Sequence, residues 1–363
     1  MELATTLTTQ TVRNAVREIG INPNHWYAVG WADSLQPGQV IPITIWQQAI
    51  ALYRDREGHL HALADACPHR GVALHKGRVM DCHLACAYHG WEFNGQGECV
   101  KIPYLPEDQK LPPMTVPSFP AQERYGILWI FPGDPCRAAD TPLIEIPEFG
   151  QPDLLMIPIT GHFKSHFSIC NENTMDVFHG FLHQDLQGWF DPVLIQLKET
   201  DGQVQAAYNV SYKGRMAKFL GLSESANAVT TLPISIEYRY PHYFSSLQGI
   251  SSLYLMRLPV GPQESRSFAL FFFRVRLPAV ILRWVQPILV PIMQRFVLNR
   301  FLAQDIEMME SEQTTYTANP HRRYWEINPA IIAIQRLMMR QYEQYLQSQP
   351  FSHPQAAKTD RLD

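Results

Sequence analysis

Two short turns decide how this chain is organised: CPHRG at residues 67–71 and CAYHGW at residues 86–91. Each turn contains one cysteine and one histidine, and each has a glycine that lets the backbone fold tightly. Sixteen residues lie between His69 of the first turn and Cys86 of the second. Together the turns offer two thiolates and two imidazoles to one centre: Cys67, His69, Cys86 and His89.

This donor set, in this order, is typical of a Rieske [2Fe-2S] cluster, in which two cysteines bind one iron and two histidines bind the other. The same groups can bind zinc, although structural zinc sites favour sets richer in cysteine. The flanking glycines, Gly71 and Gly90, favour the cluster. Respiratory Rieske proteins have an extra cysteine in each turn, where this chain has Val72 and Tyr88. The sequence therefore predicts the lower-potential oxygenase or ferredoxin type, which passes one electron at a time.

The other cysteines and the nearby histidines have simpler interpretations. We expect four cysteines to be small buried residues: Cys82, Cys99, Cys136 and Cys170. His75 and His83 lie outside the ligand pattern, and we expect them in loops or at the surface.

Composition narrows the class of protein. The chain has 363 residues, of which 46% are hydrophobic and 18% charged, so it is long enough for two folded domains. Its net charge of −4 offers no basic surface for a phosphate backbone, which argues against nucleic-acid binding. Six cysteines are too few for a secreted disulfide framework.

The chain divides into four parts by pattern. Residues 1–25 lack a signal or transit peptide, so we interpret them as a leader without a targeting signal and expect a cytoplasmic location. Residues 26–140 contain short strand-like runs, such as 41–54 followed by a turn at 55–58, and predict an all-β domain. A proline-rich stretch follows, and we place the boundary near residue 140. Residues 141–349 form the second domain, and the polar tail 350–363 is expected to be disordered.

The second domain combines strands with helices. We expect a strand over residues 157–170, two strands within 193–212, and a hairpin made of 250–258 and 267–276. Helical spacing predicts helices over 280–311 and 330–349. The whole chain is therefore assigned to the α+β class.

A second group of metal-binding side chains lies in this domain. His179 and His183 are four residues apart, which on a helix places both imidazoles on one face, although core histidines often share this spacing. With a carboxylate they would form the facial triad of a non-haem Fe(II) oxygenase. Asp305 is our candidate, with Glu307 and Glu310 as rivals. We expect Asp176 to hold an imidazole by its second nitrogen.

The two groups together resemble the α-subunit of Rieske non-haem iron oxygenases, over residues 26–349. Residues 172–176 and 304–313 look most like the branch that contains pheophorbide a oxygenase and chlorophyllide a oxygenase. The resemblance implies a Rieske β-sandwich, a helix-grip catalytic domain, a [2Fe-2S] cluster and a mononuclear Fe(II). It also implies a homotrimer in which Asp176 links the cluster of a neighbouring subunit to His179. The family has four residues between its ligand histidines, whereas this chain has three.

The implied reaction uses O₂ and electrons from a separate reductase or ferredoxin, because no Gly-x-Gly-x-x-Gly motif follows a strand here. It would hydroxylate, demethylate or open a ring of an apolar cyclic substrate, and a pigment-like one would fit. Two other classes of protein remain open at this point. One is an electron-transfer or redox-sensing Rieske protein with a degenerate iron site, and the other is a zinc-stabilised binding module.

One apolar segment, residues 277–298, raises the question of a membrane. Pro287, Pro291, Arg283 and Arg295 interrupt it, so we do not expect a membrane-spanning helix. The simpler interpretation is a buried helix with a proline kink. The alternative is a peripheral membrane contact that admits an apolar substrate.

Overall fold

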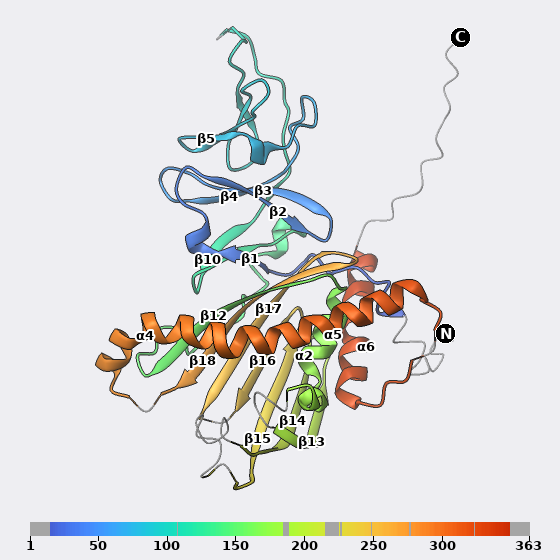
Figure 1. Cartoon of the computed structure of the whole chain (residues 1–363). Coiled ribbons are helices and arrows are strands. Elements are labelled where there is room, and N and C mark those ends of the chain that lie inside the picture. Colours follow the sequence, from blue (N-terminus) through green and yellow to red (C-terminus); the bar gives the residue numbers. More distant parts are fainter. Residues whose placement is uncertain are drawn as a thin grey trace.

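The computed structural model describes residues 15–348 except 107, 184–188, 215–224, 226, 248, 276 and 323. In this part of the chain, four antiparallel sheets and several helices form two stacked regions. Figure 1 shows three small sheets from the first region above one wide sheet, and a long helical rod across one face of the wide sheet.

The first region is all-β, as expected. Its sheets are β1 (Tyr27–Trp31), β11 (Ile127–Ile130) and β10 (Ala121–Arg124); β2 (Val40–Ile45), β3 (Gln48–Arg54), β4 (Leu60–Ala64) and β9 (Ser118–Phe119); and β5 (Arg78–Met80), β6 (His83–Ala85), β7 (Glu92–Phe93) and β8 (Cys99–Lys101). The turn expected at residues 55–58 joins β3 to β4, where Gly58 has a φ of +97° and the Asp55 carboxylate accepts the backbone N–H of His59 at 2.8 Å.

The wide sheet has seven antiparallel strands in the order β12-β18-β17-β16-β15-β14-β13. Their bounds are β12 (Leu154–Phe163), β13 (Trp189–Glu199), β14 (Gln203–Tyr212), β15 (Thr230–Arg239), β16 (His242–Leu247), β17 (Ser251–Gly261) and β18 (Glu264–Arg274). The two strands expected within 193–212 are confirmed as β13 and β14, and the expected hairpin is β17 with β18. Strands β15 and β16 were not expected.

The strand expected over 157–170 is correct only as far as Phe163. Residues Phe167–Met175 form helix α2, which begins where the His166 side chain accepts the backbone N–H of Ser168 at 3.2 Å. Most of this helix is buried, including the polar residues Asn171 and Glu172. A helix that is buried on nearly all sides shows no amphipathic period, so the helix cannot be recognised from its hydrophobic pattern.

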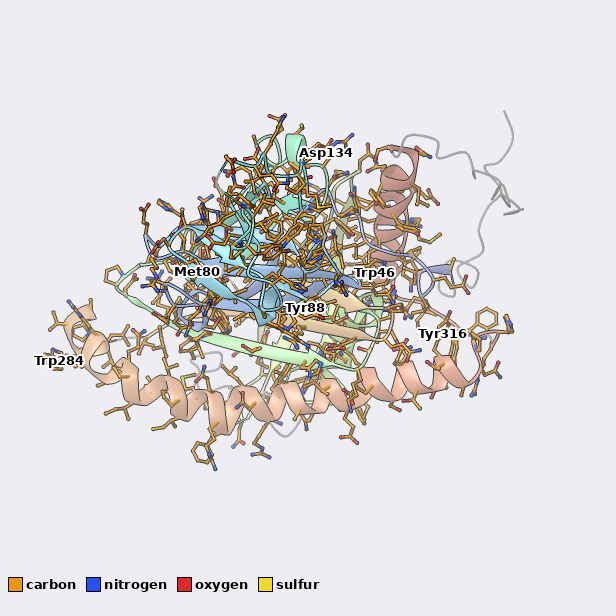
Figure 2. The ribbon with its side chains drawn as sticks, turned by 90° about the horizontal axis from the view of Figure 1, so that it is seen from above. Trp46, Met80, Tyr88, Asp134, Trp284 and Tyr316 are labelled. Carbon is orange, nitrogen blue, oxygen red and sulfur yellow. The ribbon has the colours of Figure 1, made fainter. Side chains whose placement is uncertain are left out.

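The helix expected over 280–311 extends further in the structure. It consists of α4 (Ala279–Met293), a π-helical turn η5 (Gln294–Leu298) and α5 (Asn299–Ala318). Figure 2 shows Trp284 and Tyr316 near opposite ends of this rod. The helix expected over 330–349 is confirmed as α6 (Pro329–Ser348), which buries Ile331, Ile334, Leu337 and Met338 and packs beside β14 and α2.

The interpretation of residues 277–298 as a buried helix was wrong. Leu282 is the one fully buried residue of α4, whereas five apolar side chains are exposed: Val280, Ile281, Trp284, Ile288 and Ile292. By length and composition alone, Ala279–Ala318 qualifies as a helix that could cross a membrane. Core helices of soluble proteins pass the same test, but this helix is mainly exposed.

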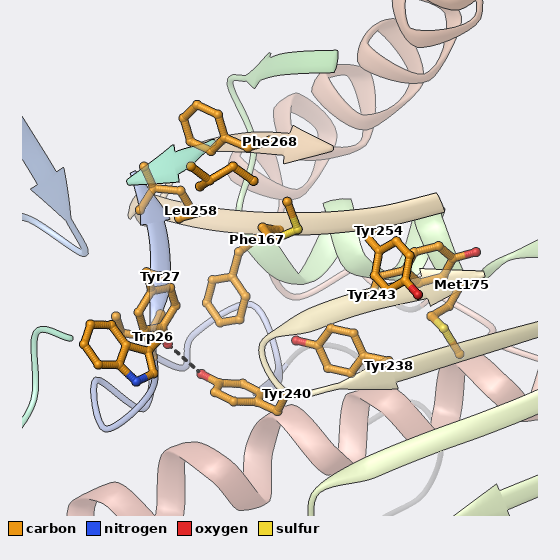
Figure 3. Close-up of a cluster of buried hydrophobic side chains, with 14 of the residues drawn as sticks. Trp26, Tyr27, Phe167, Met175, Tyr238, Tyr240, Tyr243, Tyr254, Leu258 and Phe268 are labelled. Carbon is orange, nitrogen blue, oxygen red and sulfur yellow. Dashed lines mark hydrogen bonds between the residues drawn. The ribbon is translucent and has the colours of Figure 1, made fainter. Parts of the chain in front are cut away.

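The core joins the two regions. In Figure 3, Trp26 and Tyr27 from the start of the first region lie beside Tyr240 of the wide sheet, and the hydroxyl oxygens of Tyr27 and Tyr240 are 3.5 Å apart. The segment just before them is also buried at Val16 and Ile19. The expected leader therefore needs amendment from residue 15 onward, because this stretch packs into the core. Residues 1–14 and the expected tail 350–363 lie outside the described residues.

Candidate metal centres

The first cysteine-histidine turn is closed by its own backbone. The N–H of Cys67 donates to the carbonyl oxygen of Val72 at 2.9 Å, and the N–H of Gly71 donates to the carbonyl oxygen of Cys67 at 2.7 Å. Gly71 has a φ of +70°, a conformation that favours glycine. The glycine is thus required by the fold of the turn.

The second turn repeats this arrangement. The N–H of Cys86 donates to the carbonyl oxygen of Trp91 at 2.9 Å, and the N–H of Gly90 donates to the carbonyl oxygen of Cys86 at 3.0 Å. Gly90 also has a φ of +70°. The two turns therefore have the same pattern of backbone hydrogen bonds, and each presents one cysteine and one histidine.

The four donors of the turns gather at one end of the first region. Cys67 and Cys86 are buried, and the rings of His69 and His89 lie with centroids 4.5 Å apart. His69 stacks on Trp91 at 4.7 Å with an interplanar angle of 9°. The Nδ1 atom of His69 is buried and has no hydrogen-bond partner among the described residues. A buried polar atom without a partner is rare and fits a nitrogen that binds a metal.

The protonation of these donors also suits a metal centre. Burial, together with the neighbouring Cys86, raises the pKa of the Cys67 thiol to about 11. Loss of solvent lowers the pKa of His89, and the positive charges of His69 and Arg70 add to this effect. The histidine is therefore neutral at pH 7, and the thiol would release its proton only when a cation takes its place.

The remaining cysteines and histidines are mixed. Of the four cysteines expected to be buried, Cys99 and Cys170 are buried, whereas Cys82 and Cys136 are exposed. The expectation was wrong for the exposed pair. His75 and His83 are partly exposed and pair with carboxylates, at 2.5 Å from Asp65 and 3.5 Å from Glu92 respectively.

A second cluster of donors lies under the helical rod. One ligand atom each from His179, His183 and Asp305 lie within 4.8 Å of one another. The Asp305 Oδ1 atom is 3.1 Å from His183 Nε2 and 3.9 Å from His179 Nε2. His183 is fully buried. Two imidazoles and one carboxylate in this proximity have the chemistry of an Fe(II) facial triad.

The histidine pair does not lie on an α-helix, contrary to the expectation. Helix α2 ends at Met175, and residues Val177–Phe181 form the tighter 3₁₀ turn η4. The N–H of His183 then donates to the carbonyl oxygen of Gly180 at 3.1 Å. The tighter turn still brings the imidazoles together, with ring centroids 5.2 Å apart, despite the shortened spacing.

Gly180, which lies between the two histidines, makes room for the indole of Trp189. A Cβ atom at this position would lie 1.9 Å from Nε1 of Trp189, so any larger residue would displace the indole. Trp189 packs against both imidazoles, with centroids 5.7 Å from His179 and 5.4 Å from His183. The indole thus holds the two rings from one side.

The surroundings of His183 fix its orientation. The Oε1 atom of Gln304 lies 2.9 Å from His183 Nδ1, and because an amide oxygen accepts, Nδ1 carries the proton. Nε2 lies 3.1 Å from the Asp305 Oδ1 atom, and a metal ion held by these two donors would take the place of the proton that they share. Phe301 stacks on the same ring at 3.6 Å. Sequence reasoning missed Gln304 and Phe301, although their positions one helical turn or less before Asp305 place them on its helix.

The imidazole of His179 is neutral at pH 7. Burial lowers its pKa, and the neighbouring His183 adds to this, while Asp305 and Asp176 oppose it. Its Nδ1 atom is buried without a hydrogen-bond partner among the described residues. Of the rival carboxylates, Glu307 is exposed and Glu310 accepts the backbone N–H of Lys164 at 2.9 Å. Neither belongs to the donor group.

Asp176 has different partners from those expected. Its Oδ1 atom accepts the N–H of Phe178 and the side-chain Nδ2–H of Asn328, each at 3.0 Å. Among the described residues, no hydrogen bond joins its carboxylate to the His179 ring. In the single chain, Asp176 therefore caps the 3₁₀ turn rather than holding the imidazole.

Comparisons with known proteins agree with this geometry. Residues 25–120 match the model of the Rieske [2Fe-2S] domain. The chain is 34% identical to the 4beta-methylsterol monooxygenase of Methylococcus capsulatus, over 95% of each chain. The chain belongs to the Rieske non-haem iron oxygenases. This oxygenase is also 30% identical to the chlorophyllide a oxygenase of Chlamydomonas reinhardtii, over 48% of its own chain and 26% of the relative's.

Solved structures support the fold. A crystal structure of dicamba monooxygenase bound to 3,6 dichlorosalicylic acid superposes with a TM-score of 0.73 at 23% identity, covering 90% of this oxygenase and 99% of that chain. The expected α+β class, with a Rieske region and a sheet-and-helix region, is confirmed. The expected resemblance to chlorophyllide a oxygenase is confirmed over about half of the chain.

The oxygenase therefore has both expected cofactors, a [2Fe-2S] cluster and a mononuclear iron, and the donor groups described above fit both. It is an oxidoreductase that uses O₂ and electrons from a partner protein. This interpretation fits better than an electron carrier with a degenerate iron site, because the histidine and aspartate donors converge.

The iron donors of this oxygenase open onto a cavity of about 310 Å³ between the wide sheet and the helical rod. His179 and Asp305 belong to its wall. Most of the remaining wall is apolar, and it comes from the sheet, from η5 and from α5; examples are Ile159, Leu253, Phe271, Val297 and Leu302. A mainly apolar cavity of this kind suits an apolar ligand that lies beside the iron donors.

Proposed function

We propose that this oxygenase hydroxylates, demethylates or opens a ring of an apolar cyclic substrate that binds in the cavity beside His179 and Asp305. The observation that carries the proposal is the three-donor group at the wall of a mainly apolar cavity. A relative that is named for its action on a methylsterol, and another for chlorophyllide a, support a multi-ring substrate.

We assign the cluster to Cys67, His69, Cys86 and His89, and the mononuclear iron to His179, His183 and Asp305. The matched backbone of the two turns and the orphaned Nδ1 of His69 support the first set. The short distances between imidazoles and carboxylate support the second. We also retain a domain boundary near residue 140, where the proline-rich stretch joins the two regions.

The bound cofactors supply single-electron transfer and the activation of O₂. The chain itself does the positioning. Gln304 Oε1 accepts a hydrogen bond from His183 Nδ1–H and so keeps Nε2 available as a metal ligand. Trp189 and Phe301 both contact the ring of His183, and the mainly apolar wall of the cavity surrounds the reacting groups.

We further propose a head-to-tail homotrimer. Apolar side chains are exposed around Asp176, including Phe178 and Phe181, and Trp325 and Ile327 are exposed just before its partner Asn328. At the cluster end, Tyr88 is exposed and lies against His89, with ring centroids 3.9 Å apart. Two exposed apolar surfaces, one at each metal site, would cover each other between neighbouring subunits. Light scattering of the purified protein should give three times the mass of one chain.

We propose a cytoplasmic protein that touches a membrane through α4. The exposed side of α4 carries Trp284 and Ile288, with Arg283 between apolar residues. Residues further along the same rod, Met293 and Val297, line the cavity. The rod therefore connects the exposed apolar surface with the cavity, which would allow an apolar substrate to enter from the membrane.

Electron paramagnetic resonance tests the two metal sites separately. The dithionite-reduced protein should show a rhombic cluster signal, and addition of nitric oxide should produce a high-spin iron-nitrosyl signal. Incubation with O₂, a reductase system and candidate sterols or pigments should then give an oxygenated product. A protein that shows the cluster signal but neither the nitrosyl signal nor any product would be an electron carrier instead.

A further inference from the structure

One side chain in the cavity wall is not explained by the iron site. Arg257 of β17 is almost completely buried, with 2% of its surface exposed, and it lines the cavity together with Leu253 and Leu255 of the same strand. These residues alternate along β17, so they face the same side of the sheet. Arg257 is the single arginine or lysine among the described lining residues.

The guanidinium group forms hydrogen bonds with neutral groups only, and its Nε donates to Asn171 Oδ1 at 3.4 Å. Its Nη2 donates to the carbonyl oxygen of Cys170 at 3.1 Å and to Thr174 Oγ1 at 3.0 Å, and it lies 4.8 Å from the centre of the Phe163 ring. Within the described part of the chain, it forms no ion pair with a carboxylate, and Nη1 has no hydrogen-bond partner. Burial of an arginine without a counter-charge is costly, so such a group is expected to have a binding partner.

The neighbouring strands pack closely beside Arg257. Its partner across the sheet is Ser267, and the next residue in the same row is Gly161. A Cβ atom at Gly161 would lie 2.7 Å from Ser267 Oγ and 2.5 Å from the Phe163 ring. Small residues are therefore needed in this row, because the Phe163 ring and the Ser267 hydroxyl already fill the space above Gly161.

The charge of the cavity favours an anion. Asp176 and Asp305 are the carboxylates among the described lining residues. Iron(II) at the donor group would offset both of them, and the positive charge of Arg257 would then remain without compensation. Arg257 lies close to the iron donors, because Thr174, which it contacts, is next to Asn173, whose Nδ2 is 3.4 Å from Asp305 Oδ1.

We propose that Arg257 binds a carboxylate on an otherwise apolar ring compound, so that the acid group is held beside the iron donors. The inference rests on the proposed function and adds the chemical class of the ligand. A guanidinium group is suited to a carboxylate because it offers parallel donors and keeps its charge. The apolar walls would hold the ring, and Arg257 would fix which end of the ligand faces the iron.

Equilibrium binding of two matched probes tests this proposal. Calorimetric titration of the full-length holoprotein with 2-naphthoate and with 2-naphthylmethanol compares an acid with a neutral alcohol of similar shape. Wild-type protein should bind the acid about tenfold more tightly, and Arg257→Met should weaken acid binding by about 10- to 100-fold while changing alcohol binding by less than about threefold. Arg257→Lys should retain part of the preference, because it keeps the charge.

Controls separate this proposal from the proposed function. Leu255→Ala, in the same wall, should weaken both probes by a similar factor, because it changes shape and not charge. Equal binding of the two probes by wild-type protein would overturn the proposal even if Arg257→Met does not fold, and so would an equal loss for both probes in the folded variant. The iron-nitrosyl signal of each sample reports the metal site independently. Its absence in wild-type protein would instead overturn the proposed function.

Discussion

Replacing Gln304 by leucine tests how the chain holds its iron. Leucine has a similar size but cannot accept a hydrogen bond from His183 Nδ1–H. In the wild type, Nδ1 lies 2.9 Å from the Gln304 oxygen. His183 is fully buried, so its N–H would lose its partner and remain away from water. A buried donor without a partner costs about 1–3 kcal/mol, and the loss of such an outer partner lowers metal affinity by about 10- to 100-fold.

The assay is anaerobic competition for Fe(II) with a chelator of known affinity. We expect Gln304→Leu to bind the mononuclear iron about 10- to 100-fold more weakly, with unchanged cluster content because the cluster turns lie in the other region. Gln304→Glu keeps an acceptor oxygen and should bind iron at least as well as the wild type. If the folded leucine variant retained wild-type iron affinity, the role of Gln304 in orienting His183 would be refuted.

Three further predictions concern stability and the surface. Gly180→Ala should lower the unfolding free energy by about 1–3 kcal/mol and loosen the iron site, because the new Cβ would meet Trp189. Thermal unfolding would detect this loss of stability. Burial lowers the pKa of His166 and of His242 to about 3, whereas unfolded histidine titrates near 6.5, so the unfolding free energy should fall below pH 6.5 by up to about 1.4 kcal/mol per pH unit for each. Trp284→Glu should reduce binding to phosphatidylcholine-phosphatidylglycerol vesicles by about tenfold or more in a sedimentation assay.

Each of these predictions has a matched control. Gly202→Ala adds the same methyl group in open space and should leave thermal stability nearly unchanged, so an equal loss in both variants would contradict the packing argument. His242→Phe should lose less stability than wild type between pH 7 and pH 5 in chemical denaturation, and an identical pH dependence would count against buried neutral histidines. Val229→Glu changes an exposed apolar residue outside α4, and it should leave vesicle binding intact.

The cluster turns could be predicted because their information is local. Each turn holds its two donors and its glycine within six residues, and the backbone hydrogen bonds that close it stay inside the turn. The iron donors are different, because Asp305 is more than a hundred residues from His183. It was a candidate because a facial triad needs a carboxylate, and spacing did not separate it from Glu307 and Glu310. Gln304 and Trp189 could not be assigned roles, since their contacts with the histidines exist only in the folded chain.

The errors in the fold have the same origin. The apolar composition of α4 is equally compatible with a buried helix and with an exposed one, and the choice depends on what packs against it. The first four residues of helix α2 were taken for the end of a strand, because burial on nearly all sides hides the period of the helix. Two hairpins of the sheet were predicted correctly, because their sequences showed clear alternation and turn residues: β13 with β14, and β17 with β18.

The buried contact of Arg17 has a consequence for how the protein can be handled. Its guanidinium pairs with Glu172 of α2 at 2.5 Å and with Glu312 of α5 at 2.9 Å, so a residue that precedes the first sheet neutralises carboxylates from two helices far along the chain. Expression of the second half alone would leave both carboxylates without this partner, one of them in a dry interior. Cutting the chain at its proline-rich connection would therefore not yield an intact iron-binding fragment.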